Sequence, residues 1–114
     1  TTEQVISPRA AKLLAGMLTS VVENHYRAAK IDHYYIAGKT GTAQIPEGRA
    51  YSDTRTNHTF VGFAPADDPQ LVMLVKFEEP HYDPLHRWAE NTTIPVFKDI
   101  MQFALNYYSI PGTK

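Results

Sequence analysis

Residues 36–44 read Ile36-Ala37-Gly38-Lys39-Thr40-Gly41-Thr42-Ala43-Gln44, and this stretch decides how the rest of the chain is interpreted. It has the length of a β-strand, yet most of its side chains are small or hydroxylated and one is a lysine. Such a strand is poorly suited to filling a hydrophobic core. Its composition favours a strand against whose backbone an anionic group of another molecule can lie.

The alternation of side chains along a strand divides this stretch into two faces. Residues two apart point to the same face, so Lys39 and Gly41 are expected on one face and Thr40 and Thr42 on the other. The lysine charge and the threonine hydroxyls can hold a carboxylate, and an extended peptide can pair with the strand where Gly41 leaves the backbone accessible. The backbone N–H of Thr42 can also donate to a developing oxyanion. Lys39 to Thr42 are therefore the candidate site.

The lysine-threonine-glycine triplet has two other interpretations. It can be an ordinary edge strand with a surface lysine. It can also end a phosphate-binding loop, because Gly38-Lys39-Thr40 matches the last three positions of that motif. The motif also needs a glycine where this chain has His33, and a helix after the lysine, whereas here Pro46 follows within a few residues. The phosphate loop is therefore disfavoured.

The composition of the 114-residue chain excludes several classes of protein. With 43% hydrophobic and 20% charged residues it is ordinary for a globular chain, and a net charge of -1 argues against nucleic-acid binding. The lack of cysteine excludes disulfides, thiol catalysis and cysteine-based zinc sites. His81 and His86 share a loop with acidic residues but match no zinc motif, so no metal and no cofactor is expected. The chain starts at Thr1 without a signal peptide or membrane span, which suggests a piece of something longer.

Periodicity and turn residues predict an α+β fold: a helix, a three-stranded antiparallel sheet and a C-terminal helix. The first helix is expected to begin at Ser7-Pro8 and to carry one apolar face, followed by a polar stretch from 23 to 32. Strands are predicted at 34–45, 58–64 and 71–77, with 46–48 ending the first strand and a polar loop running to residue 57. Thr93 is expected to cap the final helix, and Pro111-Gly112 to stop it.

Three segments, in the same order, resemble one known family. Ala37 to Gln44 is similar to the lysine motif of class B penicillin-binding proteins, the peptidoglycan transpeptidases. Phe60-Val61-Gly62-Phe63-Ala64-Pro65-Ala66 and the turn after it resemble the family's next strand, and residues 94–101 with Ile110-Pro111 resemble its closing helix. The glycine-lysine-threonine-glycine-threonine-alanine-glutamine run leans towards the division-type branch. Residues 1–114 are thus interpreted as the C-terminal portion of a transpeptidase domain, a partial penicillin-binding/β-lactamase-like fold.

The resemblance implies roles for the candidate site. Lys39 would supply positive charge near a nucleophile and the substrate carboxylate. Thr40 and Thr42 would bind the carboxylate of a peptide ending in D-Ala-D-Ala or of a β-lactam, beside Gly41. The Thr42 backbone N–H would supply half of the oxyanion hole. The expected location is the extracytoplasmic face of the bacterial inner membrane, with an anchor outside this chain and with wall-synthesis or division proteins as further partners.

The family's nucleophile motif is missing from this sequence. Ser-x-x-Lys places a lysine one helical turn from the serine. The residues three positions after the four serines of this chain are Ala10, Glu23, Arg55 and Gly112. Ser-x-Asn is also absent, since Ser52-Asp53-Thr54 ends in threonine. We therefore expect a chain that is inert alone, exposes a strand edge, and docks on its missing N-terminal half or self-associates. A non-catalytic β-lactam or peptidoglycan-binding module is the alternative, and a β-lactamase is less favoured.

Overall fold

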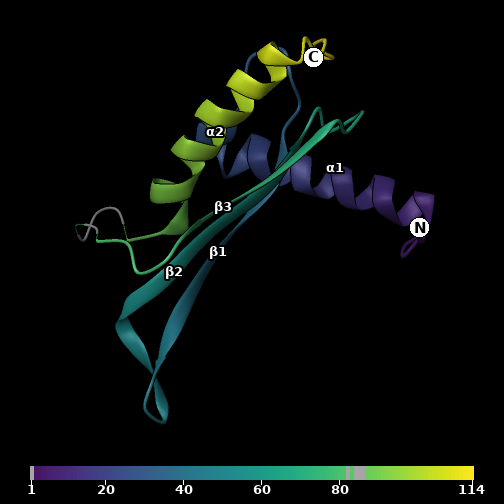
Figure 1. Cartoon of the computed structure of the whole chain (residues 1–114). Helices are drawn as coiled ribbons and strands as arrows, with labels where there is room; N and C mark the ends of the chain where they lie inside the picture. The colour runs from purple at the N-terminus through teal and green to yellow at the C-terminus, as the bar shows by residue number, and fades with distance from the viewer. Residues whose placement is uncertain (1, 82, 84–86) are drawn as a thin grey trace.

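The computed structural model describes residues 2–81, 83 and 87–114, and it confirms the predicted α+β class. Two helices pack against a three-stranded antiparallel sheet of order β1-β2-β3 (Figure 1). The elements are α1 (Pro8–Asn24), the short 3₁₀ turn η1 (Arg27–Ala29), β1 (Ala37–Glu47), β2 (Ala50–Ala64), β3 (Leu71–Phe77) and α2 (Ala89–Tyr107). Ser7 caps α1 as predicted, because its side chain accepts a hydrogen bond from the Ala10 N–H at 3.1 Å.

The β1–β2 hairpin is longer than predicted, and the expected polar loop before residue 57 is wrong. The two strands pair from Ala37 with Phe63 to Glu47 with Ala50. The register of the pairing shifts between Gln44 and Pro46. The hairpin turns at Gly48, whose φ of 64° suits glycine. β1 lies at the edge of the sheet, where a proline costs no ladder hydrogen bond. The polar residues of both strands are therefore paired with each other in an arm that projects beyond the helices (Figure 1).

The second hairpin agrees with the prediction. β2 pairs with β3 from His58 with Phe77 to Ala64 with Leu71, and β3 has the predicted bounds. The turn between them begins with a cis Ala64–Pro65 peptide bond and closes with a hydrogen bond from the Gln70 N–H to the Ala64 carbonyl at 3.2 Å. The pairing of these two strands therefore confirms the predicted hairpin.

The core lies between the sheet and α2. The ring of Phe60 on β2 packs edge-on against Phe97 on α2, with centroids 4.7 Å apart, and both side chains are fully buried. Ile94, Met101 and Leu105 continue the buried stripe of α2 at helical spacing. Gly62 lets α2 approach closely, because an added Cβ would lie 2.7 Å from the Phe97 ring and 2.9 Å from the Ala37 carbonyl oxygen.

Both ends of α2 differ from the prediction. The helix begins at Ala89, and Thr93 is an interior residue that does not cap it. The Thr93 hydroxyl donates to the Ala89 carbonyl at 2.6 Å, a bond one turn back along the same helix. The helix ends at Tyr107, before Pro111, because Ser109 adopts a positive φ of 53° and the Ile110 N–H bonds back to Leu105. A side-chain bond of Thr93 at one end and a backbone bond of Ile110 at the other thus accompany bounds that differ from the sequence signals.

The sheet face opposite α2 is largely uncovered. Val72 and Leu74 of β3 are 74% and 63% exposed, and Val61 of β2 lies beside them at 44%. We call Val61, Val72 and Leu74 the open sheet face. The apolar side of α1 is also exposed, with Met17 at 66%. Among the described residues, neither α1 nor α2 combines the length and the apolar composition that a membrane span needs.

Candidate functional site

Lys39 to Thr42 lie in β1, whose second edge pairs with no other strand in the described structure. Lys39 and Thr42 are exposed, and Thr40 and Gly41 are half-buried. The chain continues after Lys39 as a strand, so the helix that a phosphate-binding loop requires does not form. The site is therefore a polar strand edge open to an approaching ligand.

The two faces of β1 are occupied as the alternation predicts. On the α2 side, the Thr42 hydroxyl accepts a hydrogen bond from the Ala89 N–H at the start of α2, at 3.3 Å. On the other side, a Cβ at Gly41 would lie 2.5 Å from the hydroxyl oxygen of Thr59, its partner on β2. A side chain at Gly41 would displace Thr59. Because the Thr42 oxygen accepts from Ala89, its own hydroxyl hydrogen stays available to a ligand.

The Lys39 ammonium is held at the free edge by neutral oxygens. Its Nζ donates to the Tyr26 hydroxyl oxygen and to the Thr40 carbonyl, both at 3.1 Å, and lies 3.4 Å from the Thr40 hydroxyl oxygen. The Thr40 hydroxyl also donates to the Tyr26 oxygen, at 2.8 Å. Within the described residues, no carboxylate forms an ion pair with Lys39. The positive charge is thus oriented without being neutralised.

Tyr26 is the site residue that sequence reasoning missed. It lies in the predicted polar stretch, 13 residues before Lys39, and no motif or spacing marks it. The turn after α1 fixes its backbone, because its N–H donates to the Val21 carbonyl at 3.2 Å and its carbonyl accepts from the Ala29 N–H at 2.9 Å. Its ring stands edge-on to Phe60, with centroids 6.3 Å apart. Only the folded chain brings this phenol to β1.

The electrostatics of the Tyr26 phenol reflect its two donors. Burial raises the pKa of this group, but hydrogen bonds from Thr40 and Lys39, together with the Lys39 charge, outweigh burial and make the net shift downward. The end of α1 is fixed nearby by Glu23, which pairs with Lys30 at 2.7 Å and with Lys114 at 2.9 Å. These two lysines lower the pKa of Glu23. The turn that carries Tyr26 is therefore anchored at both the backbone and the side-chain level.

The backbone of β1 presents donors at its free edge. The Thr40 carbonyl accepts from the Lys39 ammonium, so it faces away from β2. Main-chain groups repeat their direction every second residue, which places the Thr42 N–H on the same edge.

His58, the cross-strand partner of Thr42, is fully buried, and its Nδ1 lies 2.7 Å from the Thr92 hydroxyl oxygen. Burial lowers the pKa of His58.

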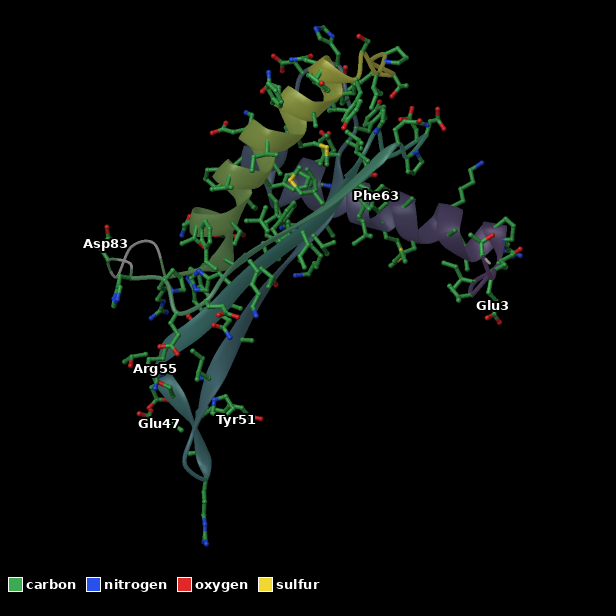
Figure 2. The ribbon with its side chains drawn as sticks, viewed as in Figure 1. Glu3, Glu47, Tyr51, Arg55, Phe63 and Asp83 are labelled. Carbon is green, nitrogen blue, oxygen red and sulfur yellow. The ribbon has the colours of Figure 1, made fainter. Side chains whose placement is uncertain are left out.

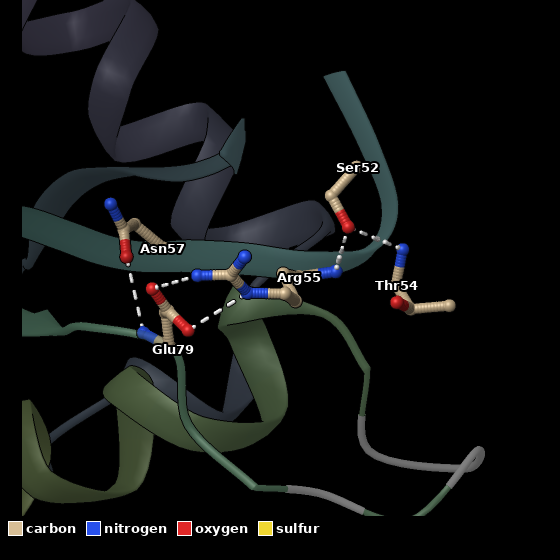
Figure 3. Close-up of polar contacts among 5 residues, drawn as sticks. All are labelled: Ser52, Thr54, Arg55, Asn57 and Glu79. Atoms are coloured by element: carbon tan, nitrogen blue, oxygen red, sulfur yellow. Dashed lines mark hydrogen bonds and ion pairs between the residues drawn. The ribbon is translucent and has the colours of Figure 1, made fainter. Parts of the chain in front are cut away.

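The projecting hairpin arm carries a separate polar network. Figure 2 shows Glu47, Tyr51 and Arg55 along the arm, and Tyr51 is 65% exposed. Arg55 makes a two-bond ion pair with Glu79, at 3.0 and 2.7 Å, and the Glu79 N–H donates to the Asn57 side chain at 3.1 Å (Figure 3). This network ties the segment after β3 to β2 and lies apart from the Lys39 ammonium.

Three of the four serines bond through their side chains to groups other than Lys39, and the fourth, Ser109, lies in the turn after α2. Ser7 caps α1, Ser20 accepts from Asn24 at 3.1 Å, and the Ser52 hydroxyl accepts from the Arg55 N–H at 3.0 Å (Figure 3). Among the described residues, no group of three or more histidine, cysteine, aspartate or glutamate side chains could hold a metal ion. His86, considered above for metal binding, lies outside the described residues.

Comparison with known proteins gives consistent results. The sequence model of a protein family, the penicillin binding protein transpeptidase domain, matches residues 1–102 of this chain. The chain is 37% identical over 110 residues to the probable peptidoglycan D,D-transpeptidase PbpC of Pseudomonas aeruginosa, covering 95% of this chain and 19% of that protein. The chain therefore spans about a fifth of the length of that curated relative.

Solved structures share the fold. The transpeptidase domain of penicillin-binding protein 3 from Burkholderia pseudomallei superposes with a TM-score of 0.87 at 31% identity, over 100% of this chain and 34% of that one. Penicillin-binding protein 3 of Mycobacterium tuberculosis, complexed with ampicillin, gives a TM-score of 0.78 at 28% identity, over 99% of this chain and 28% of that one. The fold of this chain is therefore similar to about a third of each of these longer chains.

Proposed function

The chain belongs to the transpeptidase domain family of penicillin-binding proteins, and from this we propose that it is the C-terminal part of a peptidoglycan D,D-transpeptidase of septal or elongation wall synthesis. We call the proposed longer enzyme the parent protein. The observation that carries the proposal is the uncompensated cation and hydroxyl set of Lys39, Thr40 and Thr42 on the free edge of β1. The parent would be anchored in the inner membrane and act on its extracytoplasmic face.

The proposed reaction is acyl transfer to and from a serine. The serine oxygen bonds to the carbonyl carbon of the penultimate D-alanine of a stem peptide ending in D-Ala-D-Ala, and the peptide bond to the terminal D-alanine breaks. The terminal D-alanine leaves as a free amine that has taken up the proton of the serine hydroxyl. An amine of a neighbouring stem peptide then attacks the ester, which regenerates the serine hydroxyl and forms the cross-link. A β-lactam would follow the first step only, because its opened ring stays attached.

The four residues of β1 have distinct roles in this proposal. The Lys39 ammonium and the Thr40 and Thr42 hydroxyls would bind the substrate carboxylate by charge-assisted hydrogen bonds. The Thr42 N–H would donate to the oxyanion of the tetrahedral intermediate. Gly41 keeps the strand surface low enough for the substrate to pair along the edge. Support comes from the Lys39 ammonium, which lies at the Thr40 carbonyl on the free edge, and from the Thr42 hydroxyl, whose own hydrogen is left available because its oxygen accepts from Ala89.

The nucleophile would come from upstream of this chain. Ser7, Ser20 and Ser52 bond to groups distant from Lys39, and Ser109 lies in the turn after α2. None of the four belongs to a Ser-x-x-Lys motif, so the chain alone would be inert. A second candidate function is a non-catalytic module that binds β-lactams or peptidoglycan. The missing Ser-x-x-Lys and Ser-x-Asn motifs favour that alternative only if the parent lacks them too.

Labelling with a fluorescent penicillin separates the two functions. We expect covalent label on the parent protein, retained through denaturing electrophoresis, and none on the 114-residue chain. Covalent label on the chain alone would contradict the proposed inertness. A parent that binds the penicillin reversibly, without covalent label, would support the binding module and contradict the transpeptidase.

The open sheet face suggests where the missing N-terminal half would dock. Val72 and Leu74 are large, apolar and mostly exposed, and the hollow beside them is lined by Leu14 of α1 and Phe63 of β2. β3 also has no neighbour on its outer edge in the described structure. Exposed apolar faces and unpaired edges both drive association. We propose that the upstream half of the domain covers this face in the parent.

Self-association of the isolated chain tests this docking surface. Sedimentation at micromolar concentrations should show oligomers for the chain, and the double variant Val72→Lys and Leu74→Lys should shift it toward monomer. In the parent, the same variant should lower the yield of folded protein, because it would bury two charges. Tyr107→Lys on the outer side of α2, where Tyr107 is 70% exposed, is the matched control and should do neither. A clean monomer of the unmodified chain would count against the proposal.

A further inference from the structure

The position of Tyr26 implies a role that the proposed function leaves unassigned. Its hydroxyl oxygen is the meeting point of two candidate substrate-binding groups, the Lys39 ammonium at 3.1 Å and the Thr40 hydroxyl at 2.8 Å. The ammonium also lies 5.5 Å from the centre of the Tyr26 ring. One side chain from outside the sheet therefore contacts both.

We propose that Tyr26 is a positioning residue that holds Lys39 and Thr40 at the free edge of β1, oriented toward an incoming carboxylate. The inference rests on the proposed function, since it concerns the same edge. Tyr26 would act through Lys39 and Thr40 without touching the substrate. The sequence does not indicate this role, because residues 26 and 39 come into contact only in the folded chain, where β1 lies beside the turn that follows α1.

Rigidity is the first argument for this role. Lys39 is a long side chain with several freely rotating bonds, and an unheld ammonium samples many positions. Tyr26 is fixed by backbone bonds to Val21 and from Ala29 and by its edge-on contact with buried Phe60. Binding the ammonium to a fixed oxygen lowers the entropy that a substrate would otherwise have to remove.

The charge of the phenol is the second argument. A carboxylate in the place of Tyr26 would neutralise Lys39 and compete with the substrate anion. A neutral phenol oxygen accepts from the ammonium but leaves its charge in place. A hydroxyl can also reverse its hydrogen bond, so Tyr26 can donate to Thr40 when the Thr40 hydrogen turns to the substrate. The hydrogen bond between Tyr26 and Thr40 can thus be kept before and after binding.

Acylation kinetics of the parent protein with a fluorescent penicillin test the inference. Tyr26→Phe keeps the ring beside Phe60 and removes only the hydroxyl. We expect the penicillin concentration that gives the half-maximal acylation rate to rise about tenfold, because one hydrogen bond to a charged group is lost. The limiting acylation rate should stay within about twofold of the wild-type rate. Tyr34→Phe is the matched control, because its hydroxyl bonds to the Ile110 carbonyl at 2.6 Å, and it should leave both constants unchanged.

A double variant distinguishes positioning from a structural effect. If Tyr26 acts through Thr40, the double variant Tyr26→Phe and Thr40→Val should lose much less penicillin affinity than the product of the losses in the two single variants. Thr40→Ser keeps the hydroxyl and should stay sensitive to Tyr26→Phe. Unchanged kinetics in Tyr26→Phe, or losses that multiply, would overturn the inference while the labelled wild type still supports the transpeptidase. An unlabelled wild type would refute the proposed function, and the inference with it.

Discussion

Replacing Lys39 with alanine in the parent protein is expected to lower the second-order rate of fluorescent-penicillin labelling by at least about 100-fold, the usual effect of removing a donor aimed at a developing or bound anion. Lys39 is exposed and its three contacts are to neutral oxygens, so the loss of fold stability should be small. The variant should therefore unfold at nearly the temperature of the wild type while its labelling falls.

A second lysine on the same sheet provides the matched control. Lys76 on β3 is exposed and pairs with Glu78 at 2.7 Å, away from the free edge of β1. Lys76→Ala should label like the wild type, because surface pairs of this kind contribute little. Lys39→Arg keeps the charge but not the compact ammonium, so partial recovery is expected. If Lys39→Ala were labelled as fast as the wild type, Lys39 would not belong to the proposed site.

The candidate site was predictable where it depends on local spacing. The faces of Thr40, Gly41 and Thr42 follow from strand alternation, and the contacts to Ala89 and Thr59 agree with it. Tyr26 was not predictable, because its link to Lys39 spans 13 residues and depends on how the turn after α1 is anchored. Residue spacing predicts neighbours within one helix or strand, whereas this contact joins β1 to the turn after α1.

The fold shows the same limit. The β2–β3 hairpin was predicted because both strands are apolar and the turn is rich in proline and aspartate. The polar arm of β1 and β2 was missed, since each strand satisfies the backbone of the other without burying apolar side chains. The start of α2 at Ala89 was missed for a related reason: Thr93 is a good cap by type, but its hydroxyl bonds inside the helix.

Gly62→Ala is expected to be among the most destabilising small substitutions in this segment. The new Cβ would lie 2.7 Å from the Phe97 ring and 2.9 Å from the Ala37 carbonyl oxygen, which is backbone. The ring cannot move aside freely, because Phe97 is fully buried and packs on Phe60. Either α2 shifts away from the sheet or β1 and β2 separate. Overpacking of this kind costs about 3 kcal/mol.

Heat inactivation of the parent protein measures this cost against another glycine-to-alanine change. The temperature at which half of the penicillin labelling is lost should fall by about 5 °C or more in Gly62→Ala. Gly16→Ala makes the same chemical change in α1, where the new Cβ would have no neighbour within 4 Å beyond the adjoining residues and backbone of its own helix, and it should be neutral or stabilising by up to about 1 kcal/mol. Phe97→Leu should partly rescue Gly62→Ala, because the smaller side chain makes room for the methyl group. A Gly62→Ala protein as stable as Gly16→Ala would mean that α2 does not pack on β2 as closely as the Gly62–Phe97 contact requires.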